Sequence, residues 1–404
     1  MRAEIIAVGS ELLLGQIVDT NSAFIARHFA DLGLDLYYKT TVGDNLARLE
    51  TTLRQALDRS QVVVTTGGIG PTADDITREA VAAATGRELV FSAGLMGQIE
   101  AYFAARGFKV SPSNRRQAFV PAGAIAVQNP VGTAPAFIIE AGEACVITLP
   151  GVPREMQHLL ITRVLPYLRE RYGLGEEIRL RVIRTVGLGE SRIGESLADF
   201  MEKGHNPTVG TLAHLGQVDI RIAAKARDRE TLERLIGPVE AEIRQRLGDV
   251  VFGVDAETLE SVIARGLRAA EARVAVAELG SAGAVAERLA LGAPELFAGG
   301  AILMSRGDAS RIGAALPPEG DPEVTAGMLA AAVRKWSGAA VGVATSFEDV
   351  AGADPPVTLV AIAVSRDGHT ERRHHRLGGD LPSLRIRAAI LALDLLRRAV
   401  LPSR

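Results

Sequence analysis

One segment, residues 62–77, limits the fold of this chain more than any other. It begins with Val62–Thr66, a β-branched run that predicts a strand buried in a parallel sheet. The next four positions hold three glycines, Gly67, Gly68 and Gly70. An amphipathic stretch over residues 75–85 then predicts a helix. A strand, a glycine turn and a helix in this order predict a site where backbone N–H groups bind an anion such as phosphate.

Two carboxylates, Asp74 and Asp75, follow the glycines and change the chemistry that the segment predicts. Beside a phosphate they would repel it, unless one or both hold a divalent cation such as Mg²⁺ that bridges protein and phosphate oxygens. The alternative interpretation is structural, with a glycine turn followed by an aspartate that caps the helix. The neighbouring hydroxyls of Thr66 and Thr72 favour the ligand-binding interpretation, because they can donate hydrogen bonds to phosphate oxygens.

Three other segments carry motifs of the same kind, namely Gly9–Gln16 with Asp19–Asn21, Val42–Asn45 and Leu149–Met156. Together with Gly67–Asp75, they resemble in order and spacing the competence/damage-inducible CinA family, whose first domain has a molybdopterin-binding fold. The resemblance runs nearly end to end, strongly over residues 1 to about 170 and more weakly after about 252. Four ordered motifs are far more specific than a single glycine loop.

The first predicted domain, residues 1–172, alternates strand-like and helix-like segments. The predicted strands are Glu4–Val8, Val62–Thr66, Ala124–Val127, Ala136–Ile139 and Cys145–Leu149, and the predicted helices are Asn21–Leu32, Leu46–Arg59, residues 75–85 and Pro153–Tyr172. Thr20 or Asn21 is expected to cap the first helix, and Asn45 the second. This alternation predicts right-handed βαβ units and a three-layer α/β/α domain with a parallel sheet. Ligands bind beyond the carboxyl ends of such strands, so residues 9–15, 43–45 and 66–75 should form one site.

Composition limits the partners and the compartment. The 404 residues suffice for two or three domains, and 47% hydrophobic residues with only 4% aromatic ones fit cores of Ala, Val and Leu. A net charge of −3 gives no general attraction to nucleic acid or anionic membranes. No run reaches the roughly 18 apolar residues of a membrane span, and the amino terminus does not resemble a secretory signal. The single Cys145 excludes a disulfide framework and reads as an inert core thiol, so we expect a cytoplasmic protein.

The middle region, residues 175–252, predicts a small α+β module, which the resemblance identifies as KH-like. Its predicted elements are the strands Ile178–Thr185, Thr208–Ala213 and Val218–Lys225 and the helices Gly189–Met201 and Asp228–Leu247. KH modules that bind nucleic acid clamp its backbone with a Gly-x-x-Gly loop. No two glycines between Gly187 and Gly248 have that spacing. We therefore expect a structural or dimerising module, a homodimer, and no nucleic-acid partner.

The last region, residues 253–404, resembles the α/β domain of the family that is related to nicotinamide mononucleotide deamidases. Predicted helices are Thr258–Ala270, Ser281–Leu289 and Leu384–Ala399, and predicted strands are Arg273–Ala277, Gly299–Met304, Ala340–Thr345 and Val357–Val364. The family's nucleophilic serine corresponds to Leu279, its tyrosine to Met304 and its lysine to Ala309. Ser281, two positions late, reads as a helix cap. A hydroxyl needs an adjacent base to act as a nucleophile, so we expect this domain to keep the fold without amide hydrolysis.

For the first domain the resemblance implies hydrolysis of a nucleotide pyrophosphate, with ADP-ribose as the usual substrate. Asp75 is the first choice as metal ligand, Asp74 a second ligand or a helix cap, and Glu11 a further ligand, a general base or a turn cap. The expected substrate contacts are the loop glycines, the hydroxyls and two charged side chains, namely Gly67, Gly68, Gly70, Ser10, Thr66, Thr72, Asp44 and Arg154. The turn Asn129–Pro135 is a further candidate to close over the site.

Two other functions remain open at this point. The fold of the first domain also hosts molybdopterin-related binding and nucleotidyl transfer. A non-catalytic interaction role in competence or DNA-damage physiology is the second alternative.

Overall fold

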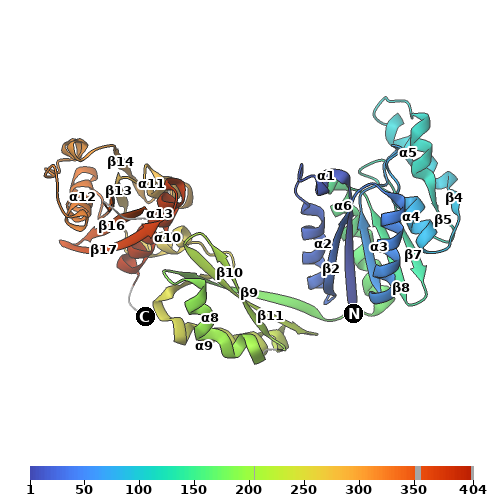
Figure 1. The fold of residues 1–404 in the computed structure, drawn as a ribbon, viewed down its shortest axis with the longest axis horizontal. Helices are drawn as coiled ribbons and strands as arrows, with labels where there is room; N and C mark the ends of the chain where they lie inside the picture. Colours follow the sequence, from blue (N-terminus) through green and yellow to red (C-terminus); the bar gives the residue numbers. More distant parts are fainter. Residues whose placement is uncertain (204, 351–355, 402–404) are drawn as a thin grey trace. The chain divides into compact units, whose positions relative to one another are not determined.

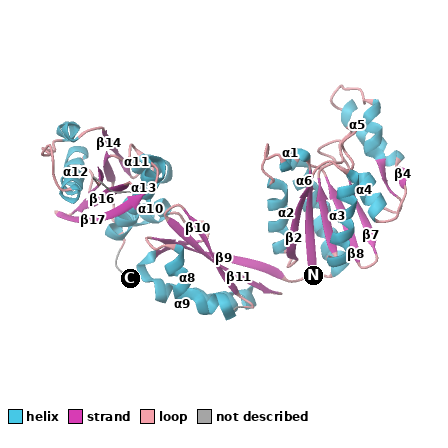
Figure 2. Cartoon of the chain, in the orientation of Figure 1, coloured by secondary structure: helices cyan, strands magenta, loops and turns pink. Residues whose placement is uncertain are grey.

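The computed structural model of the protein describes residues 1–203, 205–350 and 356–401. They form two compact units, one of Met1–Arg179 with Lys225–Glu233 and one of Leu180–Ala224 with Arg234–Arg404 (Figures 1 and 2). The predicted boundaries between three domains, at residues 172–175 and 252–253, stay predictions.

The first unit is built on a mixed sheet of six strands in the order β2-β1-β3-β8-β7-β6. The strands are β1 Arg2–Val8, β2 Asp35–Val42, β3 Val62–Thr66, β6 Ile125–Val127, β7 Ala136–Ala141 and β8 Ala144–Leu149. The strands β2, β1, β3 and β8 run parallel, whereas β7 pairs antiparallel with both of its neighbours, β8 and β6. The predicted parallel sheet is confirmed for four strands. A small hairpin of β4 Leu89–Phe91 and β5 Phe119–Pro121 was not predicted.

Helices cover both faces of this sheet, which confirms the three-layer α/β/α domain. Successive side chains of β1 point to opposite faces of the sheet, so Ile5 packs on α2 Thr20–Asp31 and on the two helices that end this domain, α6 and α7. Ile6 packs on the opposite face, against α3, α4 and α5. The remaining bounds are α1 Ser10–Leu13, α3 Leu46–Arg59, α4 Thr77–Ala84, α5 Ala93–Ala104, a 3₁₀ helix Pro112–Ala118, α6 Pro153–Leu159 and α7 Leu165–Tyr172. Cys145 is buried in this core as predicted, and burial raises the pKa of its thiol.

Three predicted helices of this domain are present but differ from the prediction in local detail. The cap of α2 is Asp19, whose side chain accepts the N–H of Ser22, and neither Thr20 nor Asn21 caps it. The helix α4 begins at Thr77, two residues after its predicted start, and has no side-chain cap. The closing helix is interrupted by a π-helical turn just before Pro166, whose ring nitrogen cannot donate the usual hydrogen bond to the preceding turn.

The second unit contains two sheets. The smaller, KH-like sheet has the order β10-β11-β9-β12, and the larger has the order β14-β13-β15-β16-β17. The bounds are β9 Glu177–Val186, α8 Glu190–Lys203, β10 Thr208–His214, β11 Gln217–Ala226, α9 Arg229–Leu247 and β12 Val251–Val254 for the smaller layer. The elements of the larger sheet and of the helices around it are α10 Leu259–Ala269, β13 Val274–Leu279, α11 Ala284–Gly292, β14 Phe297–Leu303, α12 Pro322–Ser337, β15 Val341–Asp349, β16 Val357–Arg366, β17 His369–Gly378 and α13 Leu381–Val400.

The larger sheet is also enclosed between helices. Its valines pack against α10, α11 and α13, and its alanines pack against α12 on the opposite face. The predicted cap Ser281 was wrong, because α11 begins after Gly283 and has no side-chain cap. The strand β12 and the helix α12 were not predicted from the sequence.

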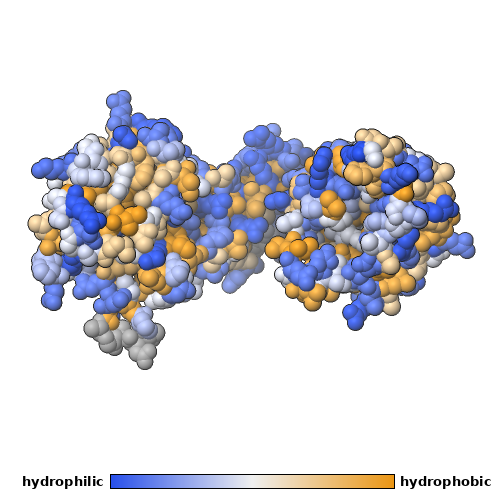
Figure 3. All heavy atoms as spheres, turned by 90° about the horizontal axis from the view of Figure 1, so that it is seen from above, coloured by the Kyte–Doolittle hydropathy of each residue, from blue (hydrophilic) through white to orange (hydrophobic). Residues whose placement is uncertain are grey.

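The surface mixes hydrophobic and hydrophilic side chains on the face shown in Figure 3. Within the described part of the chain, no helix is long and apolar enough to cross a bilayer.

Candidate functional site

The predicted motifs of the first domain meet around one cavity at the carboxyl ends of the parallel strands. Its volume is about 330 Å³. The walls come from the end of β1, from the segments after β1, β2, β3 and β8, and from the turn before β7. The lining residues are Val8, Gly9, Glu11, Asp44, Gly67–Gly70, Asp74, Asp75, Ala134 and Pro150–Val152. Of the predicted residues, the cavity brings together all four carboxylates and all three loop glycines.

The glycine loop is held open by bonds to its carbonyl groups. Gly67 has φ 104° and packs so closely on β1 that an added Cβ would lie 2.2 Å from the carbonyl oxygen of Val8. The Thr77 hydroxyl donates to the Gly67 carbonyl at 2.8 Å. Arg78 donates to the carbonyls of Ile69 and Gly70, at 2.5 and 2.7 Å. These bonds fix the peptide planes of the loop.

Two backbone donors remain free in this loop. The N–H groups of Gly68 and Ile69 make no hydrogen bond within the described chain, although both residues line the cavity. By contrast, the N–H of Gly67 is bonded to the Leu149 carbonyl and that of Gly70 to Asp75. A buried or half-buried N–H normally finds a partner, so two free donors at a cavity wall favour an anionic ligand.

Asp75 closes the loop instead of capping α4. Its Oδ1 accepts the N–H of Gly70 at 2.7 Å, and its Oδ2 accepts the N–H and the hydroxyl of Thr72 at 2.8 and 2.5 Å. An ionised carboxylate offers roughly four acceptor positions, so about one remains for a further partner. Asp74, the next carboxylate along the wall, is exposed.

The other two carboxylates of the cavity, Glu11 and Asp44, come before the glycine loop in the sequence. Asp44 and Ser10 form a reciprocal pair, in which the Ser10 N–H donates to Asp44 Oδ2 at 2.9 Å and the Asp44 N–H donates to Ser10 Oγ at 3.1 Å. The Glu11 carboxylate lies against Gly9, where an added Cβ would be 2.5 Å from Oε1. Gly9 therefore provides the space that the Glu11 side chain occupies.

Four predicted contact residues do not line the cavity. Thr66 is buried and its hydroxyl donates to the Pro150 carbonyl at 3.0 Å. Thr72 and Ser10 hold Asp75 and Asp44, and Arg154 is an exposed residue in the first turn of α6. Their direct contact with a substrate stays a prediction. From the turn Asn129–Pro135, only Ala134 reaches the wall.

Two residues that shape the site were missed. Asn21 was taken as a helix cap, but its amide donates to the Thr66 hydroxyl at 3.1 Å and to the Gly151 carbonyl at 2.8 Å, which ties α2 to two loops of the cavity. Arg78 lies on α4 and is only 2% exposed. Burial lowers the pKa of its guanidinium, which nevertheless stays charged because an arginine titrates far above neutral pH.

We expect Arg78→Met to weaken the loop. The change removes both charge-assisted hydrogen bonds and leaves two carbonyls without partners, which should cost about 2 kcal/mol of unfolding free energy. Urea denaturation followed by circular dichroism measures this loss. Arg48→Met, an exposed arginine of α3, is the matched control and should leave the midpoint nearly unchanged. An equal midpoint for Arg78→Met and the wild type would contradict the role given to Arg78.

Relatives of known sequence resemble the chain over its full length. A CinA-like protein of Kosmotoga olearia is 38% identical over 412 residues, covering 100% of both chains. A putative competence-damage inducible protein of Alkaliphilus oremlandii is 37% identical over 411 residues, covering 99% of both. The chain belongs to the CinA family. Its residues 4–170 match the model of a probable molybdopterin binding domain, and residues 180–253 match the CinA KH domain of damage-inducible proteins.

Among solved structures, the CinA protein of Thermoplasma acidophilum is 35% identical to this CinA-family chain. The match covers 42% of this chain and 96% of the Thermoplasma chain, with a TM-score of 0.38.

In the last domain of this CinA-family chain, the family resemblance places the deamidase serine, tyrosine and lysine at Leu279, Met304 and Ala309. Leu279 ends β13, Met304 is 84% exposed, and Ala309 is buried. Ser281 is fully buried and its hydroxyl bonds to Glu278 Oε2 at 2.6 Å and to the Thr345 hydroxyl at 2.5 Å. The Glu278 carboxylate also accepts three N–H groups at the start of α11, those of Gly283, Val285 and Ala286. This cluster holds the turn before α11.

Proposed function

We propose that the first domain hydrolyses the pyrophosphate bond of ADP-ribose or a related dinucleotide with the help of a divalent cation. The observation that supports this most is the pairing of two free N–H donors, on Gly68 and Ile69, with four carboxylates around one cavity. The donors suit phosphate oxygens, and the carboxylates suit a hard cation.

The charge of the cavity supports the cation. Among the described residues that line it, four are acidic and none is basic. A pyrophosphate would bring further negative charge into this space, and the two N–H dipoles alone would not offset the repulsion. A cation that contacts both the carboxylates and the phosphate oxygens would offset this repulsion.

The donor set fits Mg²⁺ with few protein ligands. In the described chain, no three His, Cys, Asp or Glu side chains converge on one point as a preformed metal cage would need. Mg²⁺ is usually held by one or two carboxylates, with water and substrate phosphates completing the shell. We assign Asp75 and Asp74 to this role. When bound there, the cation would neutralise charge on the phosphate oxygens and activate a water molecule.

The residues of the chain would supply positioning and a proton acceptor. The N–H groups of Gly68 and Ile69 would bind non-bridging oxygens and hold one phosphorus in line with the attacking water. Glu11 would accept a proton from that water. The water oxygen then forms a bond to phosphorus as the bridging P–O bond breaks, which yields AMP and ribose 5-phosphate from ADP-ribose.

We expect the purified protein to convert ADP-ribose to AMP and ribose 5-phosphate only when a divalent metal is present. Chromatographic separation of the products, with and without EDTA, tests this expectation. Restoring Mg²⁺ in excess over EDTA should restore turnover. Equal turnover in EDTA would contradict the metal dependence.

The match to a molybdopterin binding domain favours a second candidate, molybdopterin-related binding or nucleotidyl transfer. Incubation with molybdopterin and ATP, run in parallel with the ADP-ribose assay, distinguishes the two candidate activities. Absence of both reactions would favour a non-catalytic interaction role. For the last domain we propose that deamidation of nicotinamide mononucleotide has been lost.

We also expect a homodimer, in which the KH-like module contributes an apolar helix face to a symmetric contact. The monomer mass is 42.7 kDa. Multi-angle light scattering at about micromolar concentration should therefore report roughly twice this mass. A particle of the monomer mass would contradict the prediction.

A further inference from the structure

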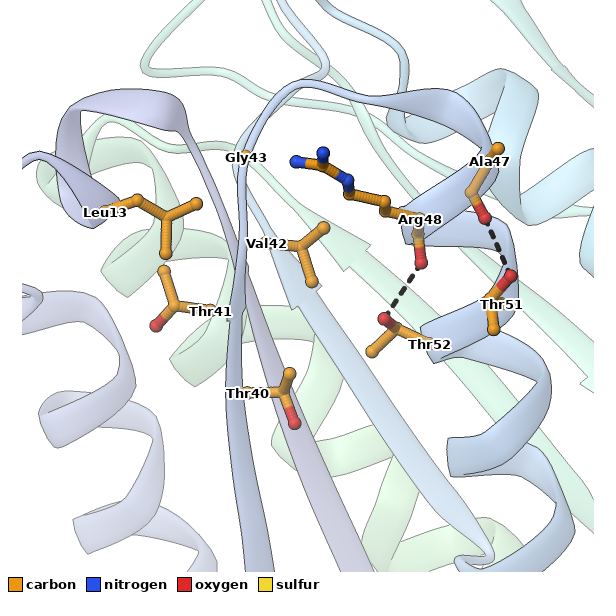
Figure 4. A pocket seen from close by; sticks show the side chains of 9 residues that line it. All are labelled: Leu13, Thr40, Thr41, Val42, Gly43, Ala47, Arg48, Thr51 and Thr52. Atoms are coloured by element: carbon orange, nitrogen blue, oxygen red, sulfur yellow. Dashed lines mark hydrogen bonds between the residues drawn. The ribbon is translucent and has the colours of Figure 1, made fainter.

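A second hollow, which we call the threonine groove, is lined in part by Gly43, on the loop that follows β2 (Figure 4). Its volume is about 530 Å³, within the size range of small-molecule sites. The groove lies between α1, the end of β2 and the start of α3. Gly43 lines the groove and Asp44, the next residue, lines the cavity, so the two spaces share this loop.

The chemistry of the groove differs from that of the cavity. No carboxylate is among its described lining residues, whose polar side chains are those of four threonines and one arginine. Leu13, Val42 and Ala47 supply apolar surface between them. A ligand part that is flat, partly apolar and rich in hydrogen-bonding groups would suit this lining, and a second phosphate would be poorly surrounded.

The threonines on α3 can act only as acceptors. The Thr51 hydroxyl donates to the Ala47 carbonyl at 2.8 Å, and the Thr52 hydroxyl donates to the Arg48 carbonyl at 2.9 Å (Figure 4). Each hydroxyl has one hydrogen, so both oxygens present only lone pairs to the groove. They would accept hydrogen bonds from a ligand that carries donors, such as an exocyclic amino group or sugar hydroxyls.

Arg48 supplies a planar cation at the edge of the groove. Its backbone is fixed by the cap of α3, where its N–H donates to Asn45 Oδ1 at 3.1 Å. In the described chain its guanidinium makes no hydrogen bond or ion pair, and Figure 4 shows it extended toward Gly43. A free guanidinium beside an apolar wall can stack on a heterocyclic base.

We propose that the threonine groove binds the adenosine part of the substrate while the pyrophosphate lies in the carboxylate cavity. The proposal rests on the proposed function for the position of the pyrophosphate. It assigns Arg48 to the face of the base and the acceptor oxygens of Thr51 and Thr52 to the adenine amino group or the ribose hydroxyls. These residues would set specificity and take no part in the bond cleavage.

Equilibrium binding to the full-length protein tests this without requiring turnover. The probes are AMP, inosine monophosphate, which lacks the amino group, and ribose 5-phosphate, which lacks the base, each titrated calorimetrically with Mg²⁺. We expect Arg48→Ala to raise the Kd of AMP about tenfold and to leave that of ribose 5-phosphate unchanged. We expect the double change Thr51→Val and Thr52→Val to remove the preference for AMP over inosine monophosphate.

Matched controls keep the test specific. Arg54→Ala removes another arginine of α3 that lies outside the groove, and Thr162→Val removes a hydroxyl that donates to its own helix in the same way. Both should bind AMP as the wild type does. The KM for ADP-ribose should rise in the groove variants while kcat stays within about twofold.

The outcomes separate the two proposals. AMP binding that depends on Arg48, without any hydrolysis of ADP-ribose, would overturn the proposed function and support the groove. Hydrolysis with an unchanged KM in the groove variants would overturn the groove and leave the function standing. Equal loss of AMP and ribose 5-phosphate affinity would place Arg48 on the phosphate and overturn the proposal, as would a wild type that binds no AMP.

Discussion

Asp75→Asn should lower kcat for ADP-ribose by at least about 100-fold, because it removes the charge of the carboxylate that we assign to the metal. The geometry makes this substitution informative. Three of the roughly four acceptor positions of Asp75 are taken by Gly70 and Thr72, and the remaining one is available to a cation. The amide keeps one acceptor oxygen for the loop but loses the charge that the cation needs.

Two measurements separate metal binding from loop structure. The Mg²⁺ dependence of turnover should shift to higher concentration in Asp75→Asn, and the thermal midpoint shows whether the loop still folds. Asp58→Asn, an exposed aspartate on α3, is the control and should leave both unchanged. Undiminished turnover in Asp75→Asn would remove Asp75 from the catalytic machinery.

The regular elements of the first domain could be predicted well because local signals agree there. Both ends of α3, at Leu46 and Arg59, match the prediction, and Asn45 caps it as expected. The strand β3 also matches at both ends, because a β-branched run between polar residues and glycines leaves little choice. The meeting of the motifs at one edge of the sheet followed from the topology of parallel strands.

The wrong predictions concern which of several adjacent polar residues forms a given bond. Asp19, Thr20 and Asn21 can all cap a helix, and the sequence does not say that Asn21 is needed by Thr66 and Gly151. Asp75 could likewise cap α4, but its carboxylate accepts the N–H groups of Gly70 and Thr72 instead. Such choices are decided by donors that lie elsewhere in the fold.

Arg78 shows a second limit. An arginine on an amphipathic helix usually lies in solvent, and nothing in its neighbours indicates burial. It is buried because the glycine loop turns its carbonyls inward, and those carbonyls need a donor. The charged strand β17 gives a weak sequence signal, since an antiparallel edge strand with polar side chains lacks the hydrophobic alternation that identifies strands.

The protein should release no ammonia from nicotinamide mononucleotide above background. A deamidase of this kind needs a nucleophile and a group that activates it, and Leu279, Met304 and Ala309 supply neither. Ammonia release by the full-length protein measures this, with a deamidase-competent CinA-family protein as positive control. We expect ammonia release by the positive control and only background release by this protein.

Restoring the nucleophile alone should also fail. Catalytic residues that act as a unit are strongly non-additive, so Leu279→Ser would create a hydroxyl without a base. Glu278 cannot serve as that base in its present arrangement, because its carboxylate already accepts the Ser281 hydroxyl and three N–H groups of the turn before α11. Ser281 is itself buried and bonded on both sides, to Glu278 and Thr345. Steady ammonia release that Ser281→Ala abolishes would show instead that Ser281 has become the nucleophile, and that the buried cluster opens to admit substrate.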